Sequence, residues 1–216
     1  MSTKNYKHVN YLWDDAVADK LDPVERLRYR SNILGADQRV TNTGGGNTSA
    51  KITEADPLSG EQVDVMWVKG SGGDLRTAKR ENFASLYMSK FLALKEQWDA
   101  SADKGVKTEL EDAMVAMYRH CVFNLNPRAS SIDTPLHGLI TARHVDHTHP
   151  ISSIAIAASK DQEQLTQDVY GDEVGYVGWQ RPGFDLGVVM GDHAAANPQY
   201  KGLIMGQHGI INWDDD

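Results

Sequence analysis

The spacing of hydrophobic residues predicts two amphipathic helices in the first half of the chain. Between residues 14 and 34, apolar side chains recur with helical spacing, and Pro23 suits the first turn of a helix. Between residues 82 and 98, one apolar stripe contains Phe83, Leu86, Tyr87, Phe91, Leu94 and Trp98. We therefore expect helices over 14–34 and 82–98.

Shorter hydrophobic runs predict strands between the helices. Strands are expected at residues 50–52, 63–69, 174–179 and 202–205, and further helices at 108–123, 131–140 and 185–196. Residues 99–107 are small, polar and charged, which predicts a loop. Strands and helices interleave without an internal repeat or a visible boundary, so the pattern favours one α/β or α+β domain over residues 1–216.

Three histidines form the strongest candidate for chemistry. His147 and His149 are two residues apart, and residues 151–157 alternate enough to predict a strand that begins at this pair. Side chains at i and i+2 of a strand share one face. His208 follows the apolar run 203–205 and is flanked by glycines. Three protein ligands with an open position are typical of a catalytic Zn²⁺, whereas the pair alone would more often be ordinary surface or core histidines.

Two glycine-rich segments are candidates for anion binding. Residues 43–49 lack the Gly-Lys-Ser/Thr of a phosphate-binding P-loop, and residues 69–73 lack the Gly-x-Gly-x-x-Gly pattern of dinucleotide sites. Each could be a tight turn that needs a positive φ, or a nest of backbone N–H groups that suits a phosphate. Together with Ser130 and Ser131 they favour the phosphate interpretation.

Asp133 and His137 lie four residues apart at the start of a predicted helix, hence on one helical face. Asp133 could cap the first turn through the free N–H groups there. Alternatively, its carboxylate could lie near the metal and act as a general base. His144 is interpreted as a solvated loop residue as readily as a functional one.

Composition narrows the possible partners. The formal net charge of −8 argues against a nucleic-acid or anionic-membrane surface, although a local loop can still bind an anion. The single cysteine, Cys121, reads as a core residue and is compatible with a reducing compartment. No apolar run approaches the ~20 residues of a membrane span, and the N-terminus lacks a signal-peptide pattern. We expect a cytoplasmic protein.

Five motifs, in this order, resemble the class II aldolase/adducin-like superfamily. They are Gly-Gly-Gly-Asn-Thr-Ser (44–49), Lys-Gly-Ser-Gly-Gly (69–73), Ser-Ser-Ile-Asp-Thr-Pro-Leu-His (130–137), His-Thr-His-Pro (147–150) and Gln-His-Gly (207–209). The set is more specific than any one motif, and it spans residues 30–213. The residues of these motifs are most similar to those of the N-terminal aldolase domain of bifunctional rhamnulose-1-phosphate aldolase/short-chain dehydrogenase proteins. We therefore expect residues 1–216 to be a truncated N-terminal part of a longer chain.

The resemblance implies a three-layer α/β/α fold with a mixed, largely antiparallel central sheet, a divalent metal (usually zinc), and homotetramers with active sites at subunit interfaces. By motif position, the metal ligands would be His147, His149 and His208, and Asp133 would be the acid/base carboxylate. The same positions would give a phosphate pocket lined by Gly46, Asn47, Ser71, Gly72, Ser130 and Ser131.

The implied reaction is a metal-dependent retro-aldol cleavage of a ketose phosphate, such as rhamnulose-1-phosphate, to dihydroxyacetone phosphate and an aldehyde. One departure matters: aldolases of the superfamily commonly place Glu directly after the paired serines, whereas here Ile132 intervenes before Asp133. The Asp-Thr-Pro sequence is also similar to ribulose-5-phosphate 4-epimerases, so that activity is an alternative. A non-catalytic, adducin-like interaction domain is the third, although adducins lack the histidine set.

Overall fold

Seven strands form a single mixed sheet at the centre of the protein. The computed structural model describes residues 11–101 and 105–216, so part of the predicted loop 99–107 lies outside the described residues. The sheet order is β3-β2-β1-β4-β7-β6-β5, and only β5 and β6 pair in parallel. The strands are β1 (Asn47–Ala55), β2 (Gln62–Lys69), β3 (Phe83–Tyr87), β4 (His144–Thr148), β5 (Val174–Val177), β6 (Gly202–Met205) and β7 (Gly209–Asp214).

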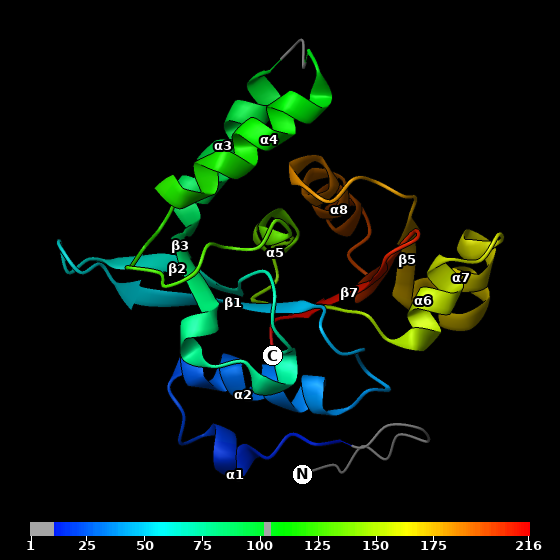
Figure 1. Cartoon of the computed structure of the whole chain (residues 1–216), viewed down its shortest axis with the longest axis horizontal. Helices are drawn as coiled ribbons and strands as arrows, with labels where there is room; N and C mark the ends of the chain where they lie inside the picture. Colours follow the sequence, from blue (N-terminus) through cyan, green and yellow to red (C-terminus); the bar gives the residue numbers. More distant parts are fainter. Residues whose placement is uncertain (1–10, 102–104) are drawn as a thin grey trace.

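Helices cover both faces of this sheet (Figure 1). One face packs against α2 (Pro23–Ala36), preceded by the short α1 (Asp15–Ala18), and against α6 (Ile151–Ala157) and α7 (Gln162–Tyr170). The other face packs against α3 (Met88–Ala100), α4 (Lys107–Met117), α5 (Thr134–Leu139) and α8 (Phe184–Ala196). Four 3₁₀ turns complete the described elements: η1 (Leu75–Thr77), η2 (Arg80–Asn82), η3 (Tyr118–His120) and η4 (Gly171–Glu173). The predicted α/β class and three-layer arrangement are confirmed.

Successive side chains of a strand point to opposite faces of the sheet, which gives one hydrophobic core on each face. In β2, Val65 and Trp67 pack towards α2, whereas Met66 and Val68 pack towards α3. Both sets are buried, so the strand reads as a continuous apolar run, as expected for a sheet covered on both sides. Cys121 is a buried core residue, as predicted. No described helix has the length and apolar character needed to cross a membrane.

Three predicted elements differ from the structure. Residues 14–34 do not form one helix, since α1 ends at Ala18 and α2 begins at Pro23. Residues 151–157 form helix α6, not a strand. Pro150 is the N-cap of this helix, and its buried side chains, Ser153 and Ala157, are four residues apart, as one helical face requires. His147 and His149 therefore lie at the carboxyl end of β4 rather than at the start of a following strand. Residues 83–87 form strand β3, so the predicted helix 82–98 begins only at Met88.

Helix α5, which follows Asp133 and carries His137, is tied to β1 by a half-buried lysine. Lys51 Nζ donates hydrogen bonds to the carbonyl oxygens of His137, Ile140 and Ala142 at 2.8, 2.8 and 2.6 Å. Burial lowers the pKa of Lys51 to about 8. A cation at the carboxyl end of a helix satisfies free carbonyl groups and complements the helix dipole.

The opposite side of α5 packs against α8 at a glycine. A Cβ atom on Gly187 would lie 2.8 Å from the carbonyl carbon of Pro135, closer than real Cβ contacts come. We predict that Gly187→Ala lowers the free energy of unfolding by ~1–3 kcal/mol, as overpacking does elsewhere, despite the better helix propensity of alanine. Urea denaturation measures this. Gly178→Ala is the control, because its Cβ would meet only Tyr176 Oη at 3.8 Å. Equal stabilities of the two variants would contradict the close approach.

Candidate metal centre and adjacent carboxylate

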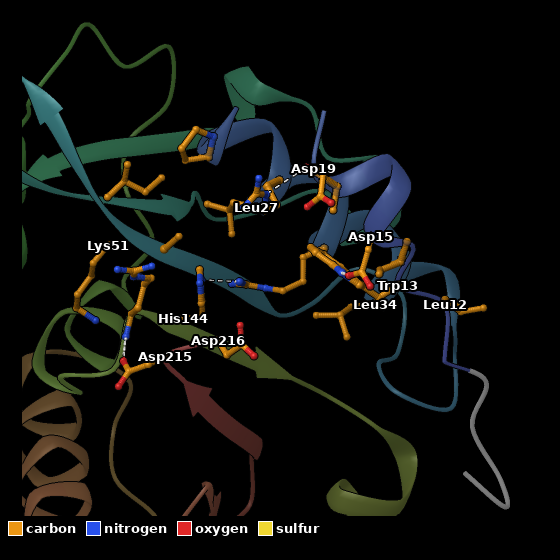
Figure 2. A pocket seen from close by; sticks show the side chains of 18 of the residues that line it. Leu12, Trp13, Asp15, Asp19, Leu27, Leu34, Lys51, His144, Asp215 and Asp216 are labelled. Carbon is orange, nitrogen blue, oxygen red and sulfur yellow. Dashed lines mark hydrogen bonds between the residues drawn. The ribbon is translucent and has the colours of Figure 1, made fainter. Parts of the chain in front are cut away.

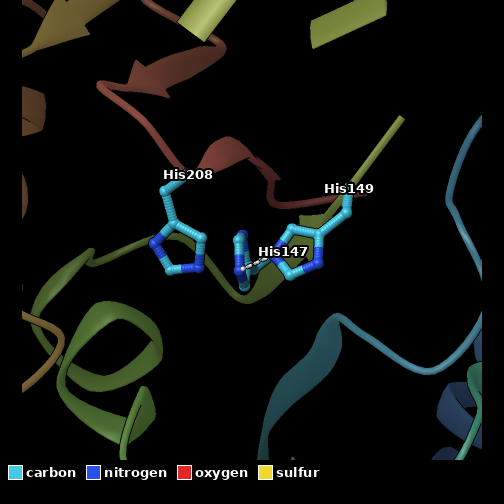
Figure 3. A group of neighbouring side chains, drawn as sticks. All are labelled: His147, His149 and His208. Carbon is cyan, nitrogen blue, oxygen red and sulfur yellow. Dashed lines mark hydrogen bonds between the residues drawn. The ribbon is translucent and has the colours of Figure 1, made fainter. Parts of the chain in front are cut away.

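The structure brings His147, His149 and His208 together at the carboxyl end of the central strand β4 (Figure 3). Their candidate ligand atoms all lie within 4.8 Å of one another. The ring centroids are 4.5 Å apart for His147 and His149, 4.8 Å for His147 and His208, and 5.2 Å for His149 and His208. The first two side chains come from the end of β4, and the third comes from the turn between β6 and β7.

Glycines let distant backbone segments pack directly against the histidines. A Cβ on Gly45 would lie 2.5 Å from His149 Nδ1, and one on Gly209 would lie 2.7 Å from His149 Cδ2. Gly46 has φ +81°, and a Cβ there would lie 2.7 Å from the carbonyl oxygen of His147. The first glycine-rich segment thus forms a wall of the histidine site.

The hydrogen bonds of His147 fix which of its nitrogens is free. Its Nδ1 lies 2.9 Å from the carbonyl oxygen of Ile210, and a carbonyl can only accept, so Nδ1 carries the proton. His147 Nε2 is then a lone-pair donor and faces His149 Nε2 at 2.8 Å. Burial lowers the pKa of His147 to about 4, and burial followed by the nearby His208 lowers the pKa of His149. Neutral imidazoles with an oriented second nitrogen are the form that binds metal ions.

Asp133 lies in a cluster of hydrogen bonds beside the histidines. Its Oδ2 accepts from Asn47 Nδ2 at 2.8 Å and from Ser131 Oγ at 3.3 Å, whereas no described residue donates to Oδ1. Burial acts to raise the pKa of this carboxyl, but His147 and the Asn47 hydrogen bond outweigh it and hold the pKa below its usual value. Since Asn47 is the register partner of His147, the β1–β4 pairing places the cluster next to the histidines.

The predicted phosphate-pocket residues converge only in part on one point. Ser71 Oγ is 3.4 Å from Ser131 Oγ, and Asn47 Nδ2 is 3.2 Å from the same atom. Ser130 is half-buried beside them, and Gly72 is exposed with φ +77°. Asn47, however, uses its amide on protein groups, because Nδ2 donates to both Asp133 and Ser131. Its side chain has no N–H left for a phosphate while those bonds persist.

The second glycine-rich segment also encloses a cation. Lys69 is buried, and its Nζ donates to the carbonyl oxygens of Gly70 and Gly72 at 3.3 and 3.0 Å. Burial, followed by the neighbouring Arg128, lowers the pKa of Lys69. The lysine places positive charge close to Ser71, which suits an anion at this loop.

Two histidines have roles that the sequence pattern did not indicate. His137 is fully buried and bonds to Ser49 and Asn47. His144 belongs to β4 and is half-buried against Arg30, so its interpretation as a solvated loop residue is wrong. The spacing of nearby residues could not predict the contacts of these two histidines, because their partners lie far away along the chain.

His144 instead faces a cavity of about 1060 Å³ between α2 and β1 (Figure 2). Lys51, Arg143 and Asp215 also line this cavity, together with side chains of the segment that precedes α2. None of the three clustered histidines lines this cavity, so the cavity is separate from the candidate metal centre.

Comparison with known proteins gives relatives for this architecture. One is the uncharacterized oxidoreductase YuxG of Bacillus subtilis (strain 168), 38% identical over 208 residues, which are 96% of this chain and 29% of that protein. This chain therefore spans less than a third of the length of that relative. The N-terminal class II aldolase domain of a conserved protein from Thermoplasma acidophilum superposes with a TM-score of 0.77 at 25% identity, covering 98% of this chain and 90% of that one.

A sugar-phosphate aldolase from Thermotoga maritima shares the fold, with a TM-score of 0.59 at 11% identity over 89% of this chain and 84% of that one. The family model described as the class II aldolase and adducin N-terminal domain matches residues 27–216, which include all three clustered histidines, Asp133 and both glycine-rich segments. The chain therefore belongs to the class II aldolase and adducin N-terminal domain family.

Proposed function

We propose that this protein is a metal-dependent aldolase that cleaves a phosphorylated ketose such as rhamnulose-1-phosphate to dihydroxyacetone phosphate and an aldehyde. The observation that carries the proposal is the juxtaposition of three mutually facing imidazoles with a carboxylate that has one free oxygen. A retro-aldol reaction needs both parts, because a carbonyl must be polarised and a proton must move on the adjacent carbon.

The side chains fit a divalent cation, with Zn²⁺ as the proposed ion. His147 presents a bare Nε2 because its Nδ1–H is committed to Ile210, and the three rings are close enough to share one ion. Such an ion, when bound by His147, His149 and His208, supplies a Lewis acid for the carbonyl and hydroxyl oxygens of the substrate.

Asp133 is the proposed proton carrier. Its pKa lies below the usual value, so it is a carboxylate at neutral pH and can accept a proton. In the condensation direction, Oδ1 takes the proton from the carbon next to the ketone of dihydroxyacetone phosphate. In the cleavage direction, the carboxylate takes the proton that leaves the substrate hydroxyl as the carbon–carbon bond breaks and the aldehyde forms. Oδ1 then gives a proton to the carbon of the enediolate.

The substrate phosphate is proposed to bind at the glycine-rich loops, on the backbone of Gly46 and Gly72 and the hydroxyls of Ser71, Ser130 and Ser131. Backbone N–H groups at positive φ and nearby hydroxyls are suitable donors to a dianion. We further propose that the protein is a homotetramer with sites at subunit interfaces, as in the family resemblance. We also propose a dehydrogenase domain in the full-length polypeptide, which the oxidoreductase name of the relative YuxG supports.

The alternative enzyme is a ribulose-5-phosphate 4-epimerase, which the Asp133-Thr134-Pro135 sequence favours. It would use the same bond cleavage but add the aldehyde back on its other face. An adducin-like interaction domain is the non-catalytic alternative, and it has no need for three facing imidazoles.

The metal assignment predicts about one divalent ion per chain in protein purified without chelator. His147→Ala should lose nearly all of it, because the bare Nε2 is removed. Elemental analysis measures the content. His144→Ala is the matched control, since it is also a β4 histidine but contacts Arg30 instead of the other two rings. Full metal content in a folded His147→Ala variant would contradict the assignment.

The reaction assignment predicts release of dihydroxyacetone phosphate from at least one member of a panel of ketose phosphates by the full-length protein. Asp133→Asn should lower kcat by roughly 100-fold or more, because the amide keeps the shape but cannot accept the proton. A coupled assay for dihydroxyacetone phosphate measures this. Conversion of ribulose 5-phosphate to its 4-epimer without that product would favour the epimerase. A metal-loaded protein inert towards the whole panel would reject both enzymes.

The phosphate assignment predicts that Ser71→Ala weakens binding of inorganic phosphate by ~10-fold, as for the loss of one hydrogen bond to a charged group. Ser71 is the most suitable choice because, within residues 11–101 and 105–216, its hydroxyl hydrogen-bonds only to Ser131, at a long 3.4 Å. Ser59→Ala, in the exposed β1–β2 hairpin, is the control. Calorimetric titration should show the change for Ser71→Ala alone, and equal affinities would place the phosphate elsewhere.

A further inference from the structure

Four polar side chains form a continuous line from the sheet to the carboxylate. Ser49 Oγ is 2.7 Å from His137 Nδ1, and His137 Nε2 is 2.6 Å from Asn47 Oδ1. Asn47 Nδ2 then donates to Asp133 Oδ2 at 2.8 Å. Ser49, Asn47 and His137 are all buried. A buried line of this kind must satisfy every donor and acceptor, so its order can be worked out from chemistry.

The order follows from the carboxylate. An ionised carboxylate only accepts, so the Asn47 amide must turn its nitrogen to Asp133 and its oxygen to His137. That oxygen also only accepts, so His137 Nε2 must carry a proton. Burial lowers the pKa of His137 to about 3, so the ring is neutral and has a single N–H. His137 Nδ1 is therefore bare. The Ser49 hydroxyl lies 2.7 Å from this nitrogen and 3.3 Å from the carbonyl oxygen of Val145, so it donates to Nδ1 at the shorter distance.

We propose that His137 is a positioning residue, which donates its Nε2–H to Asn47 and thereby holds the Asn47 amide in the one orientation that grips Oδ2 of Asp133. The orientation of these hydrogen bonds does not depend on the proposed function, but the consequence for catalysis rests on the proposed role of Asp133. With Oδ2 held, Oδ1 is the oxygen that exchanges a proton with substrate.

The geometry of α5 explains why a histidine is needed at this position. Asp133 and His137 are four residues apart across the first turn of α5, and Asn47 lies between them with a bond to each. Without a donor at position 137, the Asn47 amide could rotate by half a turn. Its oxygen would then face the carboxylate, and like partial charges would push Asp133 out of place.

The order of the line can be tested without any substrate. A long-range ¹H–¹⁵N correlation spectrum of the metal-loaded protein distinguishes a protonated ring nitrogen from a bare one. We expect His137 to be the Nε2–H tautomer, with Nδ1 bare, and to stay neutral at pH 6–8. The Nδ1–H tautomer, or a doubly protonated ring, would overturn the proposal even if the aldolase assignment holds.

The catalytic consequence needs a pair of variants. His137→Leu removes the donor and should lower kcat by ~10–100-fold, as for other outer-shell hydrogen-bond partners, while KM and metal content change little. His137→Gln can still donate an amide N–H to Asn47 and should recover much of the loss. His144→Leu is the matched control, because it removes a half-buried ring on β4 that contacts Arg30 and not Asn47 or Asp133.

The outcomes separate a positioning role from a merely structural one. If His137→Leu lowers stability and metal content, and His137→Gln restores the fold without restoring kcat, the positioning role is rejected. If no ketose phosphate is cleaved by the wild type, the aldolase proposal fails, and the tautomer measurement alone decides the order of the line.

Discussion

Alternate residues of β1 place three polar side chains, Asn47, Ser49 and Lys51, against α5, and the position of the candidate site depends on this stripe. Asn47 bonds to His137 and Asp133, Ser49 bonds to His137, and Lys51 bonds to the carbonyl of His137 and to two more beyond it. Because strand side chains at i, i+2 and i+4 share a face, one short segment fixes the start, middle and end of the helix. Asn47 and Ser49 are buried and Lys51 is half-buried, so a shift of α5 would leave several polar groups unsatisfied at once.

The sequence predicted most elements of the fold, and its errors at residues 82–98 and 151–157 have a common cause. The runs 63–69 and 203–205 predict strands from their length and composition, and residues 65–69 and 203–205 within them are buried on both sides of the sheet. Residues 83–87 are equally apolar, but they precede a helix of similar character, so the two elements merge into one apparent stripe. In residues 151–157 the isoleucines are partly exposed and the buried positions are Ser153 and Ala157. Hydrophobicity alone therefore pointed to the wrong period.

The candidate site was predictable where its chemistry is local and unpredictable where it depends on pairing. The i, i+2 spacing was enough to place His147 and His149 on one side, even though the strand ends at them rather than begins. By contrast, Asn47 and His137 are ninety residues apart, and only the sheet register and the helix position bring them together. The resemblance placed Asn47 in the phosphate pocket, whereas its hydrogen bonds commit it to Asp133. The role of Asn47 follows from which groups its amide donates to and accepts from, and the sequence alone does not show which groups lie within hydrogen-bond distance.

The face of β4 away from α5 bears on how a cation could be held at the histidines. Asp146 immediately precedes His147 in β4. Its side chain points to the α2 side of the sheet and accepts a hydrogen bond from Arg30 at 2.9 Å. Arg30 also donates to His144 and to the carbonyl oxygen of Ser49, so this residue of α2 links β4 to β1 on the face of the sheet away from α5. An unpaired guanidinium on the opposite face of the strand that carries His147 would oppose a metal ion. The Asp146 carboxylate offsets that charge at contact distance, and the ion pair thus fixes the strand that carries His147 without adding net positive charge behind it.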